Sequence, residues 1–294
     1  MEAYQDFAYV YDELMDATPY EAWCERIDGL IAKYGVSMPV GGRETMAEAG
    51  IDWNQPPEPE AIAAAGEACD ASSRDELLDS ERNLVVDLGC GTGTLTELLY
   101  QKGYDMIGID NAEEMLNVAM DKRAETGSEI LYLLQDMRKL ELYSTVGTVV
   151  SVCDSVNYIL EEDELLETFS LVNNYLYPGG IFIFDFNTEY KYREVIGDTT
   201  IAENREDCSF IWENYYDPDT NVNEYDLTVF VQEEEDIFRR FTETHYQRGY
   251  TTEQMVRLIE EAGMTLVEMK DADTGEDVTD TSERVYIVAR EHGK

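Results

Sequence analysis

The sequence predicts an α/β fold built on a largely parallel sheet, and three observations support this. Five apolar, partly β-branched runs are typical of buried strands: 84–88, 105–110, 130–134, 145–153 and 180–186. Helical periodicity lies between them: 94–102, 112–125 and 162–177. The first strand leads directly into a glycine-rich turn, VVDLGCGTGTL at 85–95. Such a turn lets backbone N–H groups approach a ligand closely.

The segments around this core are expected to differ in kind. Residues 4–34 predict two helices, the second beginning at Thr18-Pro19 and ending at Gly35. Residues 36–80 contain prolines and an Ala/Glu/Asp-rich tract without sustained periodicity, which indicates a surface insertion. Thr94 is expected to cap the helix after the glycine turn, and Pro178-Gly179-Gly180 to form the turn before the fifth strand.

The pattern changes after the fifth strand. A short helix is expected at 188–197. Three runs then alternate in polarity and predict antiparallel strands: FIWENYYD, NEYDLTVFVQEEE and DIFRRFTETHYQRGY. A helix at 252–262 and strands at 265–270 and 284–289 complete the prediction.

The composition limits the classes of partner. The chain of 294 residues has 64 Asp and Glu against 21 Lys and Arg, a formal net charge of −43. This field disfavours broad contact with nucleic acid and is typical of a solubilising surface. No apolar run reaches membrane-spanning length, and the acidic, aromatic N-terminus is unlike a signal peptide. Five scattered cysteines and two histidines predict no metal site and a cytoplasmic protein.

The glycine turn distinguishes between common phosphate and nucleotide ligands. The P-loop pattern G-x-x-x-x-G-K-[ST] is absent. A dinucleotide turn needs G-x-G-x-x-G, and Thr94 occupies its third glycine position. The observed D-L-G-C-G-T-G resembles, at every position, the first motif of class I S-adenosylmethionine-dependent methyltransferases. A nicotinamide-dependent dehydrogenase is the less favoured alternative.

Other segments extend this resemblance to the small bacterial YqeM-like methyltransferases. They are YQDFAYVYDELMD with PYEAW, CDSVNYI, FIWENYYD, HYQRGYTTEQMVRLIEEAG and ERVYIVAR. The resemblance covers nearly the whole chain except 36–80. It implies a Rossmann-like sheet of seven strands with the last one antiparallel, an N-terminal helical cover and an antiparallel β lid. The expected segments are 1–35 for the cover, 36–80 for the insertion, 81–200 with 250–294 for the cofactor domain, and 201–249 for the lid.

The resemblance also implies the cofactor site. Asp110, at the end of the second strand, would bind both ribose hydroxyls, for which a carboxylate is suited; its alternative role is to cap the next helix. Asp136 would bind the adenine amino group with Met137 against the ring; the alternative for Asp136 is an ordinary Asx turn. The full predicted set is Tyr11, Asp87, Gly89, Cys90, Gly91, Thr92, Gly93, Asp110, Asn111, Met115, Asp136, Met137 and Cys153.

The catalytic residues are less well determined. Methyl transfer needs an in-line approach, and a base is needed only if the nucleophile carries a proton. The candidates are Asp154, Tyr158 and His245, with Tyr11 as a further possibility. Asp154 could instead stabilise its loop, and a lone histidine in a strand is often a structural hydrogen-bond donor.

The acceptor pocket is expected under the helical cover and the lid. The predicted residues are Tyr4, Phe7, Asn157, Trp212, Tyr216 and Arg248. An aromatic face suits a sulfonium through cation–π attraction, although Tyr4, Phe7 and Tyr11 could simply pack in the core. Arg248 could hold an anionic acceptor or form a salt bridge with a carboxylate.

The sequence therefore predicts an S-adenosylmethionine-dependent methyltransferase, of the EC 2.1.1 class, acting on a small molecule. Two alternatives stay open: methylation of RNA or protein, and a cofactor-binding regulatory protein without turnover. The acceptor's identity and the oligomeric state are not determined by these patterns.

Overall fold

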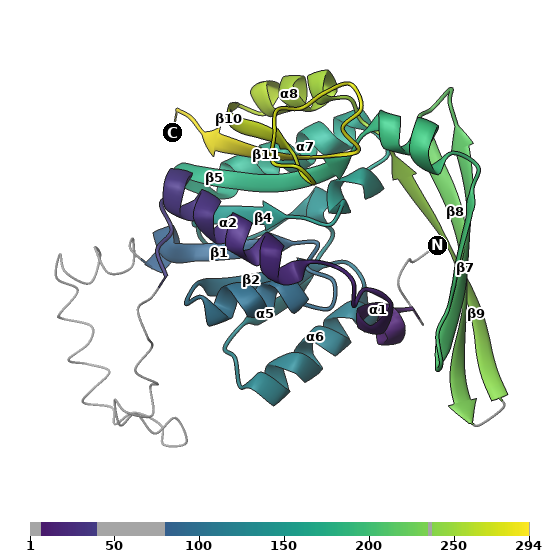
Figure 1. Cartoon of the computed structure of the whole chain (residues 1–294). Helices are drawn as coiled ribbons and strands as arrows, with labels where there is room; N and C mark the ends of the chain where they lie inside the picture. The colour runs from purple at the N-terminus through teal and green to yellow at the C-terminus, as the bar shows by residue number, and fades with distance from the viewer. Residues whose placement is uncertain (1–6, 40–79, 235–236, 294) are drawn as a thin grey trace, which may run out of the picture.

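The computed structural model describes residues 7–39, 80–234 and 237–293 (Figure 1). Its core is a seven-stranded sheet in the order β10-β11-β5-β4-β1-β2-β3. The strands are β1 (Leu84–Leu88), β2 (Asp105–Asp110), β3 (Leu131–Leu134), β4 (Val146–Ser151), β5 (Leu176–Asn187), β10 (Met264–Asp271) and β11 (Arg284–Glu291). Every neighbouring pair is parallel except the two pairs made by β11. The predicted sheet, with its last strand antiparallel, is confirmed.

Helices cover both faces of this sheet, because its central strands are apolar on both sides. In β1, Val85 faces one hydrophobic cluster and Val86 the other, as expected for alternating side chains. Two helices share the first cluster: α2 (Tyr20–Tyr34) and α5 (Thr94–Gln101). Two others share the second: α7 (Glu162–Tyr175) and α8 (Thr252–Glu261). The helix α6 (Glu113–Thr126) packs beside β2 and β3.

A second sheet lies to one side of the first, with the short helix α1 (Ala8–Leu14) against it (Figure 1). We call it the lid sheet; it is antiparallel in the order β6-β7-β8-β9. Its strands are β6 (Thr200–Asn204), β7 (Cys208–Asp217), β8 (Val222–Glu234) and β9 (Ile237–Arg248). Phe7 and Val10 pack on Leu227 and Val229 of this sheet, while Ala8 packs on α6. The start of the chain therefore joins the two sheets.

Short helical turns complete the described elements: η1 (Met137–Lys139), η2 (Ser155–Tyr158) and η3 (Lys191–Ile196). The last of these falls within the short helix expected at 188–197 and is a π-helix. Within the described ranges, no helix combines the length and apolar character needed to span a bilayer.

Three local expectations are wrong. Pro178-Gly179-Gly180 lies inside β5, where the pairing with β4 shifts register, so these residues form an irregularity of the strand rather than a turn before it. The lid sheet has a fourth strand, β6, whose side chains are all exposed; it therefore lacks the apolar alternation that identifies a strand. The N-cap of α5 is Gly93 in the left-handed region, and no side chain caps it; Thr94 instead bonds to Asp12.

Candidate active site

The glycine turn between β1 and α5 is held in a conformation that requires glycine. Gly89, Gly91 and Gly93 have φ values of 82°, 54° and 73°. The N–H groups of Gly89 and Cys90 both donate to the carbonyl oxygen of Ile109, at 2.7 and 3.0 Å, which fixes the turn to the end of β2. A Cβ on Gly89 would lie 2.6 Å from the Ser155 hydroxyl oxygen, whereas one on Gly91 would meet nothing within 4 Å. The backbone at Gly91 therefore faces open space.

Two carboxylates lie behind this turn, a buried one of Asp87 and a partly buried one of Asp110. Asp110 accepts hydrogen bonds from the N–H of Gly91 at 2.8 Å and from that of Ala112 at 2.9 Å. Asp87, within β1, accepts one from the Thr96 hydroxyl at 2.6 Å. Burial raises the pKa of Asp87 to about 7 and also raises the pKa of Asp110. The hydrogen bonds that Asp110 accepts from the backbone lower its pKa and so oppose this rise.

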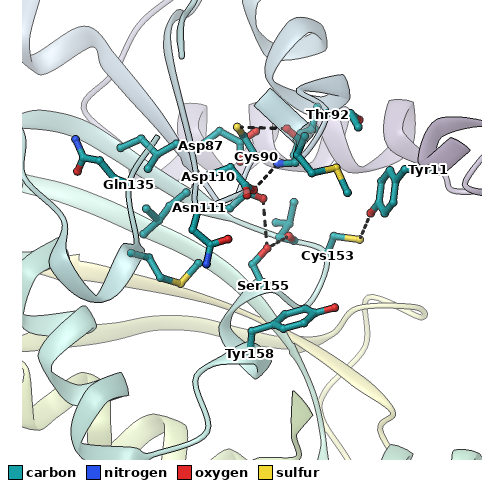
Figure 2. A pocket seen from close by; sticks show the side chains of 18 of the residues that line it. Tyr11, Asp87, Cys90, Thr92, Asp110, Asn111, Gln135, Cys153, Ser155 and Tyr158 are labelled. Carbon is teal, nitrogen blue, oxygen red and sulfur yellow. Dashed lines mark hydrogen bonds between the residues drawn. The ribbon is translucent and has the colours of Figure 1, made fainter. Parts of the chain in front are cut away.

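A cavity of about 460 Å³ opens at the carboxyl ends of the central strands, and we call it the cofactor cavity. Figure 2 shows Asp110 near its middle, with Tyr11 and Cys153 toward one end and Gln135 toward the other. Apolar side chains and polar groups both line it. They include Tyr20, Asp87, Leu88, Gly89, Cys90, Gly91, Thr92, Ile109, Asn111, Met115, Met137, Arg138, Ser155 and Thr244.

A second cavity of about 390 Å³ lies between α1, η3 and the lid sheet, and we call it the acceptor cavity. Its walls are mostly aromatic or aliphatic: Phe7, Leu14, Met15, Tyr192, Ile196, Ile201, Phe210, Trp212, Tyr225 and Leu227. A few polar side chains complete the lining: Asp154, Asn187, Lys191 and Gln247. An apolar pocket with a few polar groups is the usual form of a small-molecule site.

Four residues line both cavities and so mark where they meet: Tyr11, Cys153, Tyr158 and His245. The Tyr11 hydroxyl oxygen lies 3.9 Å from the Cys153 sulfur. The Tyr158 hydroxyl lies 3.3 Å from His245 Nδ1. This junction therefore combines two phenols, a thiol and an imidazole.

The loop after β4 is shaped by a buried ion pair. Cys153 and Asp154 both have positive φ, of 63° and 52°, and their N–H groups donate to the Asp185 carboxylate at 3.3 and 2.8 Å. Arg284 pairs with Asp185 and stacks on the Trp23 ring at 4.2 Å. Burial raises the pKa of the Asp154 carboxyl, whose side chain accepts a hydrogen bond from Gln247. The loop is thus positioned by β5, β11 and β9 together.

A polar cluster ties α1 to the glycine turn. Asp12 accepts hydrogen bonds from the hydroxyls of Thr92 at 2.6 Å and Thr94 at 3.2 Å. Lys122 of α6 lies 2.6 Å from the same carboxylate. We call these four residues the α1 cluster; it holds Tyr11 over the cavity junction.

Most of the predicted cofactor residues surround the cofactor cavity, but two do not. Gly93 and Asp136 do not line it. Asp136 accepts a hydrogen bond from the Arg138 N–H and pairs with that side chain at 2.6 Å, which lowers the pKa of Asp136. The structure thus places Asp136 in the alternative arrangement, and its contact with adenine stays a prediction.

The predicted acceptor residues divide in the same way. Phe7 and Trp212 line the acceptor cavity, and Tyr4 lies outside the described residues. Asn157 is buried and links the backbones of Asn187 and Arg248. The Tyr216 hydroxyl donates to Asn221, and Arg248 binds the Leu160 carbonyl and Glu162. These last three side chains line neither cavity.

Sequence reasoning missed several residues of the site. Six residues that line a cavity or contact a lining residue were not predicted from the sequence: Asp12, Tyr20, Lys191, Tyr225, Glu243 and Gln247. Alternation along the lid strands could have found Tyr225, Glu243 and Gln247. The last two share one face of β9 with His245, and Tyr225 pairs with His245 in register. No local pattern identifies Asp12, because its partners lie 80 or more residues away.

The cofactor cavity suits S-adenosylmethionine. The Asp110 carboxylate can receive the two ribose hydroxyls, and the open backbone at Gly91 can approach the amino-acid part. Met115 and Met137 offer apolar, polarisable surface to a purine ring. When bound, this cofactor supplies a methyl group on a positively charged sulfur.

Comparisons with known proteins agree with this chemistry. The family described as methyltransferase domain matches residues 85–180. Two bacterial relatives have names that begin "Putative methyltransferase". One, YqeM of Bacillus subtilis (strain 168), is 32% identical over 288 residues, covering 98% of this chain and 96% of that protein. The other, from Geobacillus sp. (strain WCH70), is 31% identical over 287 residues, covering 98% and 99%.

A solved structure gives the same picture of the fold. The S-adenosylmethionine-dependent methyltransferase of Clostridium acetobutylicum ATCC 824 matches with a TM-score of 0.76 and 24% identity, over 99% of this chain and all of that one. Together with the full-length relatives, the fold and the glycine turn establish the donor. The chain belongs to the YqeM-like group of class I methyltransferases, and S-adenosylmethionine is its cofactor.

Proposed function

We propose that this protein transfers a methyl group from S-adenosylmethionine to a small molecule held in the acceptor cavity. The observation that carries the proposal is the junction: Tyr11, Cys153, Tyr158 and His245 line both cavities. An acceptor in the second cavity would therefore approach a cofactor in the first across a few side chains. Holding two reactants in line is the main requirement of methyl transfer.

The size and lining of the acceptor cavity favour a compact, largely apolar acceptor. Its volume of about 390 Å³ falls within the range of roughly 300–1,000 Å³ usual for small-molecule sites. Phe7 and Trp212 supply aromatic walls, and Asp154, Lys191 and Gln247 supply polar groups. The net charge of −43 disfavours a nucleic-acid acceptor.

The residues have distinct proposed roles. Asp110 binds the ribose hydroxyls, and the glycine turn approaches the rest of the cofactor with its backbone. Tyr158 and His245, at the junction, are the candidates for catalysis, and Asp154 is a third candidate from the acceptor side. We expect the protein to act in the cytoplasm, in keeping with its scattered cysteines.

Labelled methyl transfer tests the proposal. The protein is incubated with methyl-labelled S-adenosylmethionine and a bacterial extract, which is then separated into small-molecule, RNA and protein fractions. Label in the small-molecule fraction is expected, and its loss in Asp110→Ala shows that the cofactor cavity is responsible. Label in RNA or protein alone would overturn the small-molecule acceptor. Tight cofactor binding with no label in any fraction would favour a regulatory protein.

A further inference from the structure

A chain of polar contacts leads from the cavity junction into the lid sheet. The Tyr158 hydroxyl lies 3.3 Å from His245 Nδ1, and His245 Nε2 lies 3.3 Å from a Glu243 carboxylate oxygen. The Tyr158 hydroxyl is also 2.7 Å from that of Tyr225. Phenol, imidazole and carboxylate therefore follow one another, with the phenol at the junction.

The imidazole is held in one orientation and away from water. His245 is 2% exposed, and the Tyr225 ring stacks on it with centroids 4.9 Å apart and planes 7° from parallel. The Glu243 side chain is only 9% exposed, and its second oxygen accepts a hydrogen bond from the Phe7 N–H at 3.1 Å. A carboxylate 3.3 Å from Nε2 favours the neutral tautomer with its proton there, so that Nδ1 presents its lone pair to the Tyr158 phenol.

We propose that Glu243, His245 and Tyr158 form a proton relay, so that the acceptor's nucleophile is an O–H or N–H group. The inference rests on the proposed function and narrows its substrate class. The nucleophilic atom forms a bond to the methyl carbon as the carbon–sulfur bond breaks, leaving its electron pair on sulfur. The proton of the nucleophile passes to the Tyr158 oxygen, whose own proton passes to His245 Nδ1. The positive charge lost from sulfur thus reappears on the imidazolium beside Glu243.

The surroundings favour this relay as the general base over Asp154, the carboxylate that lines the acceptor cavity. Asp154 lines the acceptor cavity but not the cofactor cavity, and its side chain is engaged by Gln247. Besides Glu243, the titratable or charged groups that the described residues place around His245 or in the same cavity belong to several elements. Tyr158 of η2, Tyr225 of β8, Tyr11 of α1 and Cys153 lie at or beside the junction, and Asp154, Lys191 and Tyr192 line the acceptor cavity. A positioning carboxylate, a buried imidazole and a phenol at the junction together make a general base.

Nuclear magnetic resonance of the histidines tests the relay without any acceptor. The chain has two histidines, so His292→Gln assigns both ring signals in ¹⁵N-labelled protein. We expect neutral His245 to carry its proton on Nε2, and Tyr158→Phe to shift the Nδ1 resonance. The control Tyr215→Phe, a half-exposed tyrosine of the lid sheet, should leave it unchanged. A proton on Nδ1, or no shift in Tyr158→Phe, would overturn the relay.

Kinetics supply the second readout. Tyr158→Phe and Glu243→Gln are expected to slow labelled transfer into the small-molecule fraction by about 100-fold, the lower limit of general-base effects. Calorimetry should find S-adenosylmethionine affinity within about threefold of wild type, and Glu213→Gln, exposed on β7, is the matched control. Unchanged transfer in both variants of an active protein overturns the relay alone. Failure of the wild type to methylate any fraction overturns the proposed function itself.

Discussion

The two cavities of this protein are built in different ways. The cofactor cavity is lined largely by the ends of successive strands: the turn after β1, the end of β2, and the loops after β3 and β4. The acceptor cavity takes its walls from α1, η3 and all four strands of the lid sheet. The cofactor cavity is formed by backbone turns and the carboxylates of Asp87 and Asp110, and the acceptor cavity by aromatic and aliphatic surfaces.

Because of this difference, cofactor binding and the proposed acceptor binding depend on different parts of the chain. Carboxyl ends of parallel strands meet at one edge of the sheet, so short motifs far apart in sequence supply a common cofactor site. The acceptor cavity depends on how α1 and the lid sheet pack on that edge. We therefore expect substitutions to affect cofactor affinity and acceptor affinity separately, except at the junction and in the α1 cluster.

The largest expected effect concerns the buried carboxylate under the glycine turn. Asp87 has a pKa of about 7 against 3.8 for an ordinary aspartate. As pH rises from about 4 to 7, the unfolded chain loses this proton before the folded one, so this group costs stability, and the full cost remains above pH 7. The unfolding free energy of Asp87→Asn minus that of wild type should therefore rise by about 3 kcal/mol between pH 5 and pH 8.

Urea unfolding of both proteins at the two pH values measures this difference. Because the comparison is between variants at each pH, the general effect of the high net charge cancels. A difference independent of pH would show that Asp87 is ionised in the folded protein at pH 5.

The next effect breaks the cofactor cavity alone. Asp110→Ala removes the carboxylate expected to bind the ribose, and two charge-assisted hydrogen bonds predict at least a ~100-fold loss of S-adenosylmethionine affinity. Calorimetry measures it, with near-ultraviolet circular dichroism to confirm folding. Asp105→Asn, at the other end of β2, is the matched control. Affinity within threefold of wild type would exclude Asp110 from the cofactor contacts.

A smaller effect should fall on the acceptor side only. Trp212 lines the acceptor cavity and packs on Tyr225, with ring centroids 4.9 Å apart. Trp212→Leu should raise the KM for the labelled small-molecule fraction about tenfold, since apolar contact is lost. S-adenosylmethionine affinity should stay unchanged. Ile211→Ala, exposed on the opposite face of β7, controls for damage to the strand; an equal effect there would remove Trp212 from the acceptor wall.

The smallest effect tests the connection between the two sides. Asp12→Asn weakens the α1 cluster and should loosen α1 from the glycine turn. Because the Asp12–Lys122 pair is partly exposed, we expect only about a fivefold loss of cofactor affinity. Asp16→Asn, in a more exposed pair with Arg205, should change it less than twofold. Equal affinities in the two variants would show that α1 is held by its apolar contacts.

The local motifs of the chain determined much of this architecture. The glycine turn, Asp110 at the end of a strand and the loop from Cys153 each follow a buried strand in sequence, and their spacing places them at one edge of a sheet. Asp136 shows the limit: a strand end can direct a carboxylate either to the cavity or to a neighbouring cation. In this protein the Asp136 carboxylate pairs with Arg138, two residues away, and no strand pattern predicts that pairing.

Contacts between distant segments were decided by the tertiary structure. Glu243 meets Phe7 across more than two hundred residues, and Tyr158 meets His245 because η2 lies under β9. Arg248, attractive in sequence as a rare cation, is engaged by Glu162 because its parity on β9 is opposite to that of His245. The sequence by itself determined the fold class, through the periodicity of its strands and helices, and indicated the methyl donor, through the resemblance of its glycine-turn motif to that of class I methyltransferases. Only the packing of α1 and the lid sheet determined the acceptor cavity and the side chains of the proposed relay, because those surfaces form from residues with no local pattern in common.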